Sequence, residues 1–188
     1  VRLCNDANAA ALCEGWLGAG RGCAHYFCMT FGTGIGAALV IDSKIYEGAH
    51  LRAGEICYFD YSSDEVNLEK KISTKNVMEQ AAKRLGLPSL DGHEFFRRLR
   101  AGDAVIAEEF ERWMEQAARM LANVVSVFDP DKIIIGGGIS AESGILLPAL
   151  RTRIARMLPE ELHRDVVIEA AQFTNDAGML GAVSQFPH

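Results

Sequence analysis

The sequence has few cysteines, and the five that it has do not resemble a disulfide framework. Their number is odd, none forms a Cys-x-x-Cys pair, and all lie in the first third of the chain: Cys4, Cys13, Cys23, Cys28 and Cys57. Buried free thiols are therefore favoured, and a structural zinc site that includes His25 is a weak alternative. This usage is typical of a protein in a reducing, cytoplasmic setting.

Long apolar runs and basic clusters are also missing. The longest apolar runs, such as residues 124–128 and 133–135, fall far short of the about 20 residues that a membrane-spanning helix needs. Lys and Arg total 19 against 25 Asp and Glu, the formal net charge is −6, and no basic block exceeds two residues. We therefore expect no membrane span, no signal peptide and no binding of nucleic acid by this chain.

The remaining composition is that of an ordinary folded protein. Hydrophobic residues make up 49% and charged residues 23% of 188 residues, which excludes disordered and fibrous classes and suits one large domain. Residues 1–4 resemble the end of a strand that runs straight into a helix, so we expect a fragment of a longer protein.

Hydrophobic periodicity and glycine punctuation predict alternating strands and helices. Strands are expected over residues 24–31, 37–41, 44–46, 132–135 and 166–168. Helices are expected from Asp6 (at or near the N-cap) to Gly18, and over residues 73–86, 91–100, 103–128, 141–158 and 175–185, with a polar loop over residues 60–69.

Two glycine clusters are candidate phosphate or nucleotide sites. The segment 32–36 lies between two strands, so it is neither a dinucleotide fingerprint nor a P-loop. Its backbone N–H groups and the Thr33 hydroxyl can still meet phosphate oxygens, although a tight turn is the simpler interpretation. Residues 136–138 are expected as a turn between a buried strand and a helix, where a nucleotide can approach closely, but glycines at strand ends are common.

Acidic residues supply the candidates for proton transfer and ligand binding. Asn5 and Asp6 pair an amide with a carboxylate, yet residues 175–177 open the last helix in the same way, so capping explains the pattern equally well. Glu55 lies in an apolar, glycine-flanked segment and needs a partner if buried, either a ligand or a salt bridge. Residues 129–131 have the Asp-Pro-Asp sequence typical of a turn, which explains them better than metal ligation does.

The order of four segments is more specific than any one of them: Asn-Asp-Ala-Asn-Ala-Ala-Ala-Leu at 5–12, Gly-Thr-Gly-Ile-Gly at 32–36, Gly-Ala-His-Leu-Arg-Ala-Gly-Glu at 48–55, and Asp-Pro-Asp-Lys-Ile-Ile-Ile-Gly-Gly-Gly at 129–138. Together they resemble the ROK family of sugar kinases and repressors. The resemblance implies an actin-like, ribonuclease H-like α/β fold with a mixed sheet flanked by helices. Two such domains close on sugar and ATP in the family, and residues 1–188 resemble the C-terminal one, with the N-terminal domain absent from this chain.

The resemblance also assigns roles to the acidic residues. Asp6 would be the catalytic base that accepts the proton of the attacking sugar hydroxyl, a task that requires a carboxylate within reach of that hydroxyl. Asn5 would hydrogen-bond the sugar, Glu55 matches a sugar-binding glutamate, and Glu69 is a looser match to a second one.

The glycines would serve the nucleotide. Gly32, Thr33 and Gly34 would face the ATP phosphates, and Gly137 and Gly138 would lie along the adenosine. Mg²⁺ would be held mainly by the phosphates.

The chain departs from the family pattern at two places. Cys57 and Tyr58 stand where the family has Gly-His, so we expect Tyr58 to contact the sugar in place of the histidine. The cysteine-rich zinc loop is missing, which predicts no zinc and a shortened polar loop over residues 60–67.

Three interpretations follow from the resemblance. The first is ATP-dependent phosphorylation of a hexose or N-acetyl amino sugar by a cytoplasmic kinase, with a homodimer suggested by the family. The second is a sugar-sensing transcriptional repressor of the same family. The third is that the 188 residues by themselves form an inactive, dimerising module.

Overall fold

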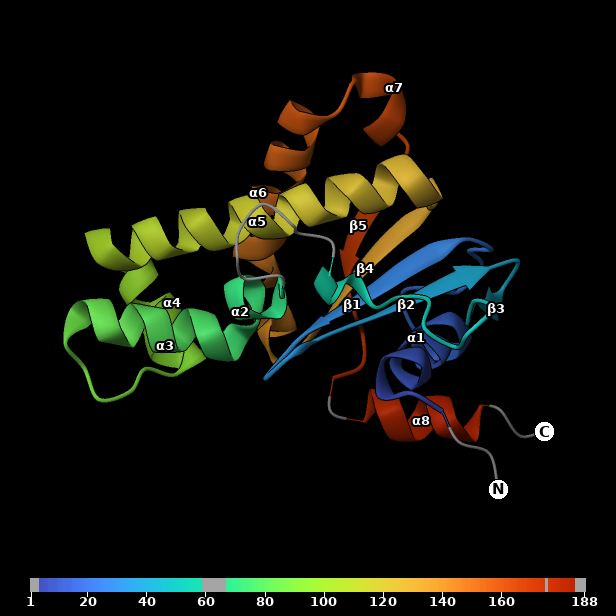
Figure 1. The fold of residues 1–188 in the computed structure, drawn as a ribbon, viewed down its shortest axis with the longest axis horizontal. Helices are drawn as coiled ribbons and strands as arrows, with labels where there is room; N and C mark the ends of the chain where they lie inside the picture. Colours follow the sequence, from blue (N-terminus) through green and yellow to red (C-terminus); the bar gives the residue numbers. More distant parts are fainter. Residues whose placement is uncertain (1–3, 59–66, 175, 185–188) are drawn as a thin grey trace.

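The computed structural model describes residues 4–58, 67–174 and 176–184, and its fold is shown in Figure 1. The strands are β1 (Tyr26–Phe31), β2 (Ile35–Ile41), β3 (Lys44–Ile45), β4 (Lys132–Gly137) and β5 (Val167–Ala170). The α-helices are α1 (Asp6–Leu17), α2 (Glu69–Ile72), α3 (Thr74–Leu85), α4 (Gly92–Arg100), α5 (Ala104–Phe128), α6 (Ser143–Met157), α7 (Glu160–His163) and α8 (Ala177–Val183). Two short 3₁₀ helices are η1 (Ile56–Tyr58) and η2 (Gly138–Glu142).

The five strands form one mixed sheet in the order β3-β2-β1-β4-β5. The chain passes through β1, β2 and β3 as an antiparallel meander, and β4 and β5 then add in parallel beyond β1. Because β1 and β4 are parallel neighbours, their carboxyl ends meet at one edge of the sheet, where Phe31 pairs with Gly137. Both glycine clusters therefore lie at the same edge.

Helices cover both faces of this sheet (Figure 1). Successive side chains of a strand point to opposite faces, and β1 divides in this way: Phe27, Met29 and Phe31 join the large core under α5 and α6, and Tyr26 and Cys28 join a small core under α1. Burial in that small core raises the pKa of the Cys28 thiol to about 12. α8 packs beside α1 on the same face.

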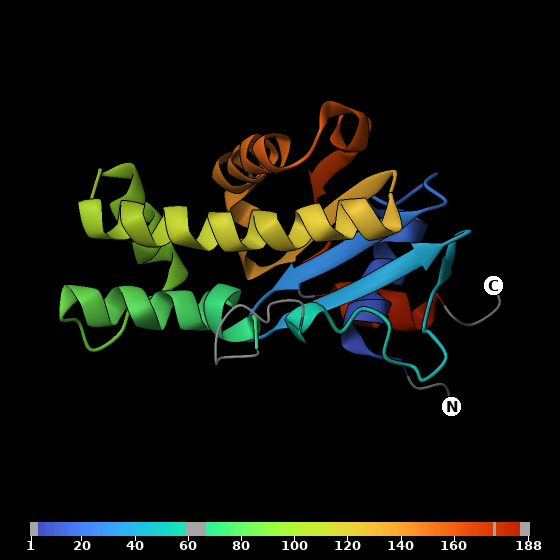
Figure 2. The same cartoon turned by 45° about the horizontal axis from the view of Figure 1, so that its top comes forward.

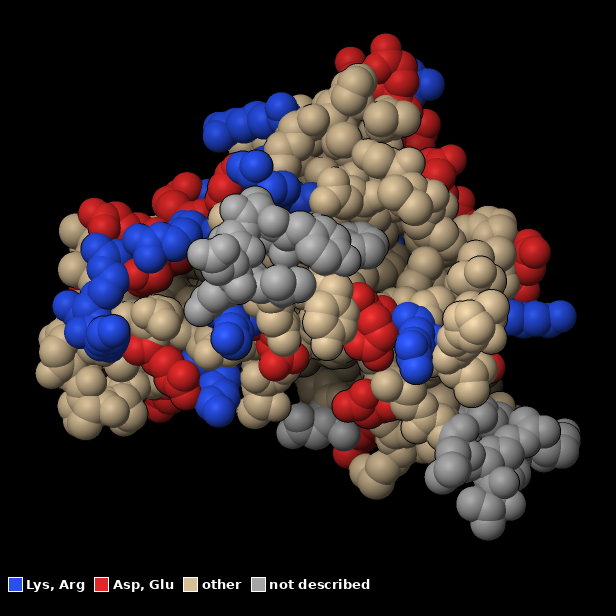
Figure 3. Space-filling model, viewed as in Figure 1, with Lys and Arg blue, Asp and Glu red and all other residues tan. Residues whose placement is uncertain are grey.

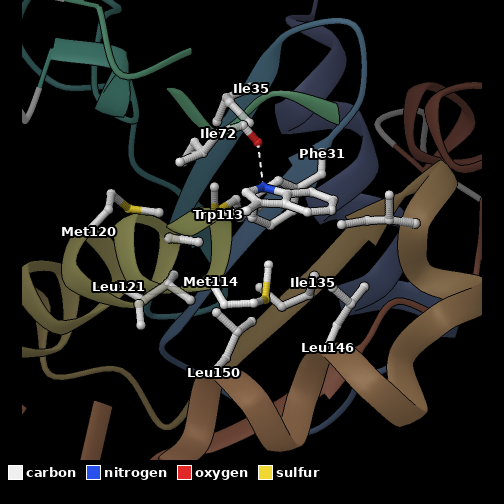
Figure 4. Packing of buried hydrophobic residues seen from close by; sticks show 14 of the residues in the cluster. Phe31, Ile35, Ile72, Trp113, Met114, Met120, Leu121, Ile135, Leu146 and Leu150 are labelled. Atoms are coloured by element: carbon white, nitrogen blue, oxygen red, sulfur yellow. Dashed lines mark hydrogen bonds between the residues drawn. The ribbon is translucent and has the colours of Figure 1, made fainter. Parts of the chain in front are cut away.

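The helices from α2 to α5 extend beyond the sheet as a helical lobe (Figure 2). Trp113 of α5 is the largest side chain in the large core that surrounds it, and its Nε1 donates a hydrogen bond to the Ile72 carbonyl oxygen at 2.8 Å. Phe31 and Phe95 pack against the indole at ring-centroid distances of 6.0 and 6.1 Å, and Figure 4 shows the surrounding aliphatic side chains. This indole therefore joins the sheet to the helix that begins at Glu69.

Most of the predicted elements are confirmed, and the differences lie at glycines and ends. Gly136 and Gly137 were expected in a turn, but they are the last two residues of β4, because the ladder with β1 continues to that point. The helix expected from residue 141 begins as the 3₁₀ turn η2 and becomes α-helical at Ser143. The loop expected over residues 60–69 falls mostly outside the described residues, and Glu69 already belongs to α2. None of the helices in the described part of the chain is long and apolar enough to span a bilayer.

Candidate functional site

A cavity of about 360 Å³ lies where the carboxyl ends of β1 and β4 meet the start of α1. Its wall includes nine of the ten residues singled out from the sequence: Asn5, Asp6, Gly32, Thr33, Gly34, Glu55, Glu69, Gly137 and Gly138. These residues come from five separate parts of the chain, so the fold and not the sequence brings them together. A hollow on the face seen in Figure 3 has acidic side chains along its rim.

The start of α1 places the amide and the carboxylate that were candidates for sugar binding and catalysis. Asn5 is the N-cap, and its Oδ1 accepts hydrogen bonds from the backbone N–H groups of Ala7 at 2.9 Å and Asn8 at 3.2 Å. Asp6 is exposed and accepts from Ala7 N–H at 2.8 Å. The capping interpretation is thus confirmed for Asn5, while the Asp6 carboxylate remains open to the cavity.

Gly36 allows α1 to lie close to the sheet. A Cβ at Gly36 would sit 3.1 Å from the Ala7 Cβ and 2.8 Å from Thr30 Oγ1. This close approach brings the first turn of α1 next to the glycine hairpin, and Asp6 and Thr33 line the same cavity.

Glu69 supports the tip of the glycine hairpin. Its Oε2 accepts a hydrogen bond from Ile35 N–H at 3.3 Å, and a Cβ at Gly34 would lie 2.7 Å from the same oxygen. At the other side of the tip, Gly32 N–H donates to the Gly34 carbonyl oxygen at 3.0 Å. Residues 32–36 therefore form a tight turn and also line the cavity. The interpretation as a tight turn and the interpretation as a phosphate site are compatible.

Gly54 fixes the position of Glu55. Its φ of +94° suits glycine, and a Cβ there would lie 2.6 Å from the Ala37 carbonyl oxygen. The loop thus rests directly on β2, and Glu55 follows it as an exposed residue of the cavity wall. Within the described ranges Glu55 forms no salt bridge.

Cys57 and Tyr58 differ in where they point. Cys57 is buried, and its thiol donates to the Ile35 carbonyl oxygen at 3.5 Å. Burial, and then the charges of Glu69 and Glu55, raise the pKa of this thiol, so it stays protonated at neutral pH. Tyr58 is 52% exposed and is the one predicted site residue that the cavity wall does not include.

A second cavity, of about 750 Å³, adjoins the first and was missed by sequence reasoning. The two share Phe31, Gly32, Thr33 and Gly138 in their walls. Its other wall comes from α3 and the loop after it: Thr74, Lys75, Met78, Glu79, Ala82, Lys83, Leu87, Pro88, Ser89 and Leu90. In the sequence these residues look like one side of an amphipathic helix, so nothing there indicated a ligand.

No metal centre is formed by the protein in the described ranges 4–58, 67–174 and 176–184, where no three His, Cys, Asp or Glu side chains converge. The prediction that Mg²⁺ is held mainly by nucleotide phosphates stays a prediction, and so does the absence of zinc. Asp6 and Glu55, two acidic residues of the cavity wall, are exposed.

The strand order, the two adjoining cavities and the loops around them define an actin-like, ribonuclease H-like α/β domain. The chain belongs to the ROK family, whose model matches residues 1–188. It is 32% identical over 194 residues to a beta-glucoside kinase of Listeria monocytogenes, a match that covers 99% of this chain and 64% of that protein.

Two solved structures show the same fold. A ROK family glucokinase from Streptomyces griseus, in complex with glucose and AMPPNP, superimposes with a TM-score of 0.85 at 29% identity, covering 96% of this chain and 66% of that one. A ROK family transcriptional regulator, a homologue of the E. coli MLC protein, superimposes with a TM-score of 0.82 at 24% identity, covering 96% and 50%. The chain spans 62–64% of the length of the first curated relatives that it matches.

Proposed function

We propose that the protein is a cytoplasmic sugar kinase that transfers a phosphoryl group from ATP to a hydroxyl of a hexose or N-acetyl amino sugar. The observation that supports the proposal is that Asp6 and the Gly32–Gly34 hairpin line one cavity, the smaller of the two. A kinase needs a base at the attacking hydroxyl and backbone donors at the phosphate in one space. The kinase relatives in the same family support this assignment.

In this proposal the smaller cavity holds the sugar. Asn5, Glu55 and Glu69 offer an amide and two carboxylates, the groups that hydrogen-bond sugar hydroxyls. Asp6 accepts the proton of one hydroxyl, whose oxygen forms a bond to the γ-phosphorus while the bond from that phosphorus to the ADP oxygen breaks. The sugar contact of Tyr58, which lies outside the cavity wall, stays a prediction from its place in the motif.

The larger cavity would hold the nucleoside of ATP, with the phosphates at the shared wall. Thr33 and the backbone of Gly32 and Gly34 would bind the phosphates, and Mg²⁺ would come with them. Gly137 and Gly138 would lie along the adenosine. A Cβ at Gly138 would meet nothing within 4 Å, so this position is open to a ligand.

The proposal takes residues 1–188 as the C-terminal α/β domain of a two-domain protein, and the share of its relatives that the chain covers supports this. Homodimer formation belongs to the same proposal and rests on the family resemblance. By itself the domain would carry the base and part of both ligand sites, so we expect turnover from the full-length gene product.

The test is an assay of ADP release by the full-length gene product with ATP, Mg²⁺ and a panel of hexoses, N-acetyl amino sugars and glycosides. Asp6→Asn should lower kcat by about 100-fold or more, because the amide cannot accept the proton. Asp176→Asn is the matched control, since Asp176 is an exposed N-cap residue of α8 outside both cavities.

One result would contradict the role of Asp6, and another would contradict the kinase itself. An Asp6→Asn protein with unchanged kcat would remove Asp6 from the mechanism. No turnover with any sugar, together with sugar-dependent thermal stabilisation, would instead favour the sugar-sensing repressor, whose fold the MLC homologue shares.

A further inference from the structure

A third cavity, of about 310 Å³, lies in the helical lobe, where α3 and α5 pack side by side and α2 meets them (Figure 2). It shares no wall residue with the two cavities at the carboxyl ends of β1 and β4. Its wall comes from α2, α3 and α5: Lys70, Lys71, Val77, Gln80, Glu109, Arg112, Trp113 and Gln116. The cavity is therefore a separate feature of the helical lobe.

The wall combines buried apolar side chains with exposed polar ones. Its four residues from α5 are spaced as i, i+3, i+4 and i+7, so they share one face of that helix. Val77 and Trp113 are buried. Lys70, Gln80 and Arg112 are exposed. A ligand in this cavity would meet an apolar surface on one side and charged or amide groups on the other.

The one acidic group among the described residues of this wall already has a close partner outside it. Glu109 has a side chain that is only 5% exposed, and its Oε1 accepts a hydrogen bond from Arg84 Nη1 at 2.9 Å. Arg112 Nη1 lies farther from the same carboxylate, at 3.3 and 3.4 Å from its two oxygens. Glu109 therefore does not depend on Arg112 for its neutralisation.

Positive charge is in excess around the cavity. Lys70, Lys71 and Arg112 line it together with the single carboxylate of Glu109. In the part of the chain that the structure describes, Lys70 makes no salt bridge. A concave surface lined by one sign of charge attracts ions of the opposite sign, so this cavity favours an anion.

The size and the other wall groups narrow the class of anion. The volume is near the lower end of the about 300–1,000 Å³ of small-molecule sites. A guanidinium and an ammonium suit a phosphate group. Gln80 and Gln116 offer amide donors and acceptors for hydroxyls, and Val77 and Trp113 offer apolar surface to a carbon skeleton. A small phosphorylated polyol carries all three kinds of group.

We propose that this cavity is a second ligand site, which binds the phosphate monoester of a hexose. Lys70 and Arg112 would bind the phosphate, with Lys71 beside them, and Gln80 and Gln116 would bind the hydroxyls. The inference goes beyond the proposed function, because the cavity contains none of the reacting groups and its ligand can be measured without turnover. If the protein is the sugar kinase proposed above, its own product belongs to this ligand class.

The test measures binding of glucose 1-phosphate and glucose 6-phosphate to the full-length protein by calorimetry, without ATP. Glucose and inorganic phosphate are titrated separately as the two parts of the probe. Lys70→Gln and Arg112→Gln each remove one cation, and Arg112→Gln should keep the wild-type melting temperature because Glu109 retains Arg84. Arg119→Gln is the matched control, since Arg119 is an exposed arginine two turns farther along α5 and outside the cavity.

Wild type should bind at least one of the two hexose phosphates, and each cavity variant should weaken that binding by about tenfold, the scale of one charge-assisted contact. Arg119→Gln should bind as wild type does, and so should Lys44→Gln, which removes an exposed lysine outside the cavity. The inference is overturned if wild type binds neither probe, or if both cavity variants keep the wild-type affinity. Inorganic phosphate that binds as tightly as the better hexose phosphate would also overturn it, because the hexose would then make no contact.

Glu55→Gln separates this cavity from the proposed sugar site, where a hexose phosphate can bind as a product. Binding that is weakened by Glu55→Gln but unchanged in Arg112→Gln would place the probe in the smaller cavity and reject the inference. Binding that survives Glu55→Gln and is weakened by Arg112→Gln supports it. Failure of the kinase assignment is a separate result, since a lack of turnover with every sugar leaves these affinities unchanged.

Discussion

Two adjacent glycines at the end of β4 have different physical roles. Gly137 has a φ of +89°, and a Cβ there would overlap the Phe31 carbonyl oxygen of the neighbouring strand. Gly138 has no atom within 4 Å of the corresponding position and lines both cavities. The first glycine is needed by the fold, and the second leaves room for a ligand.

This difference predicts opposite effects of two small substitutions. Gly137→Ala should lower the free energy of unfolding by about 2–4 kcal/mol, because it adds both backbone strain and overlap. Gly138→Val should leave stability unchanged within about 0.5 kcal/mol and raise the KM for ATP by about tenfold, which corresponds to about 1.4 kcal/mol of binding. Denaturant unfolding and ATP titration of both variants check this, and a Gly138→Val protein with a wild-type KM would argue against nucleotide at that wall.

Sequence reasoning identified these glycines but not their difference. The run of glycines after an apolar segment predicted a nucleotide site. The apolar segment itself predicted the strand before the glycines. The ladder between β1 and β4 that makes Gly137 part of a strand joins residues more than 100 positions apart. No local pattern contains that pairing.

At the scale of elements, α2 is too short to hold its own position. It has four residues, begins at Glu69 and ends at Ile72, whose carbonyl oxygen accepts the bond from Trp113. A helix of this length has no intrinsic stability in water, so its placement depends on α5. Glu69 in turn supports the glycine hairpin through Ile35 N–H.

Trp113→Phe should therefore affect the site from a distance. The Ile72 carbonyl oxygen would lose its indole donor inside the core, which should cost about 1–3 kcal/mol of stability. We also expect a severalfold higher KM for the sugar, because α2 loses the bond that holds it to α5. Trp16→Phe is the control, since Trp16 is 40% exposed on α1. Equal losses in both variants would show a general effect of tryptophan removal.

The element scale also shows where sequence prediction succeeds and fails. The long helices were predicted closely because their apolar spacing is strong, and α5 was expected over 103–128 and observed over 104–128. The role of α3 could not be predicted, because Lys75, Met78 and Lys83 form a cavity wall only when α3 lies beside the end of β1. Tyr58 was predicted as a sugar contact because it stands where the family motif has a histidine. Its exposed position outside the cavity wall depends on how η1 packs against β2.

At the scale of the whole molecule, two cavities with different walls meet at the carboxyl ends of β1 and β4. Acidic and amide side chains border the smaller cavity. The larger cavity is bordered by lysines and apolar residues of α3 and of the loop that follows it. Since the two cavities share only Phe31, Gly32, Thr33 and Gly138, substitutions elsewhere in one wall should leave the other cavity unchanged.

We therefore expect the two KM values to respond to different residues. Lys83→Ala should raise the KM for ATP severalfold and leave that for the sugar unchanged, and the effect should shrink at high ionic strength because Lys83 is exposed. Glu55→Gln should raise the KM for the sugar by about tenfold and leave that for ATP unchanged, because an amide replaces one acceptor oxygen by a donor. Lys44→Ala and Glu47→Gln are matched controls on exposed residues outside both cavities. If Lys83→Ala changed the KM for the sugar instead, the nucleotide and the sugar would have to exchange cavities, and Asp6 could not reach the attacking hydroxyl.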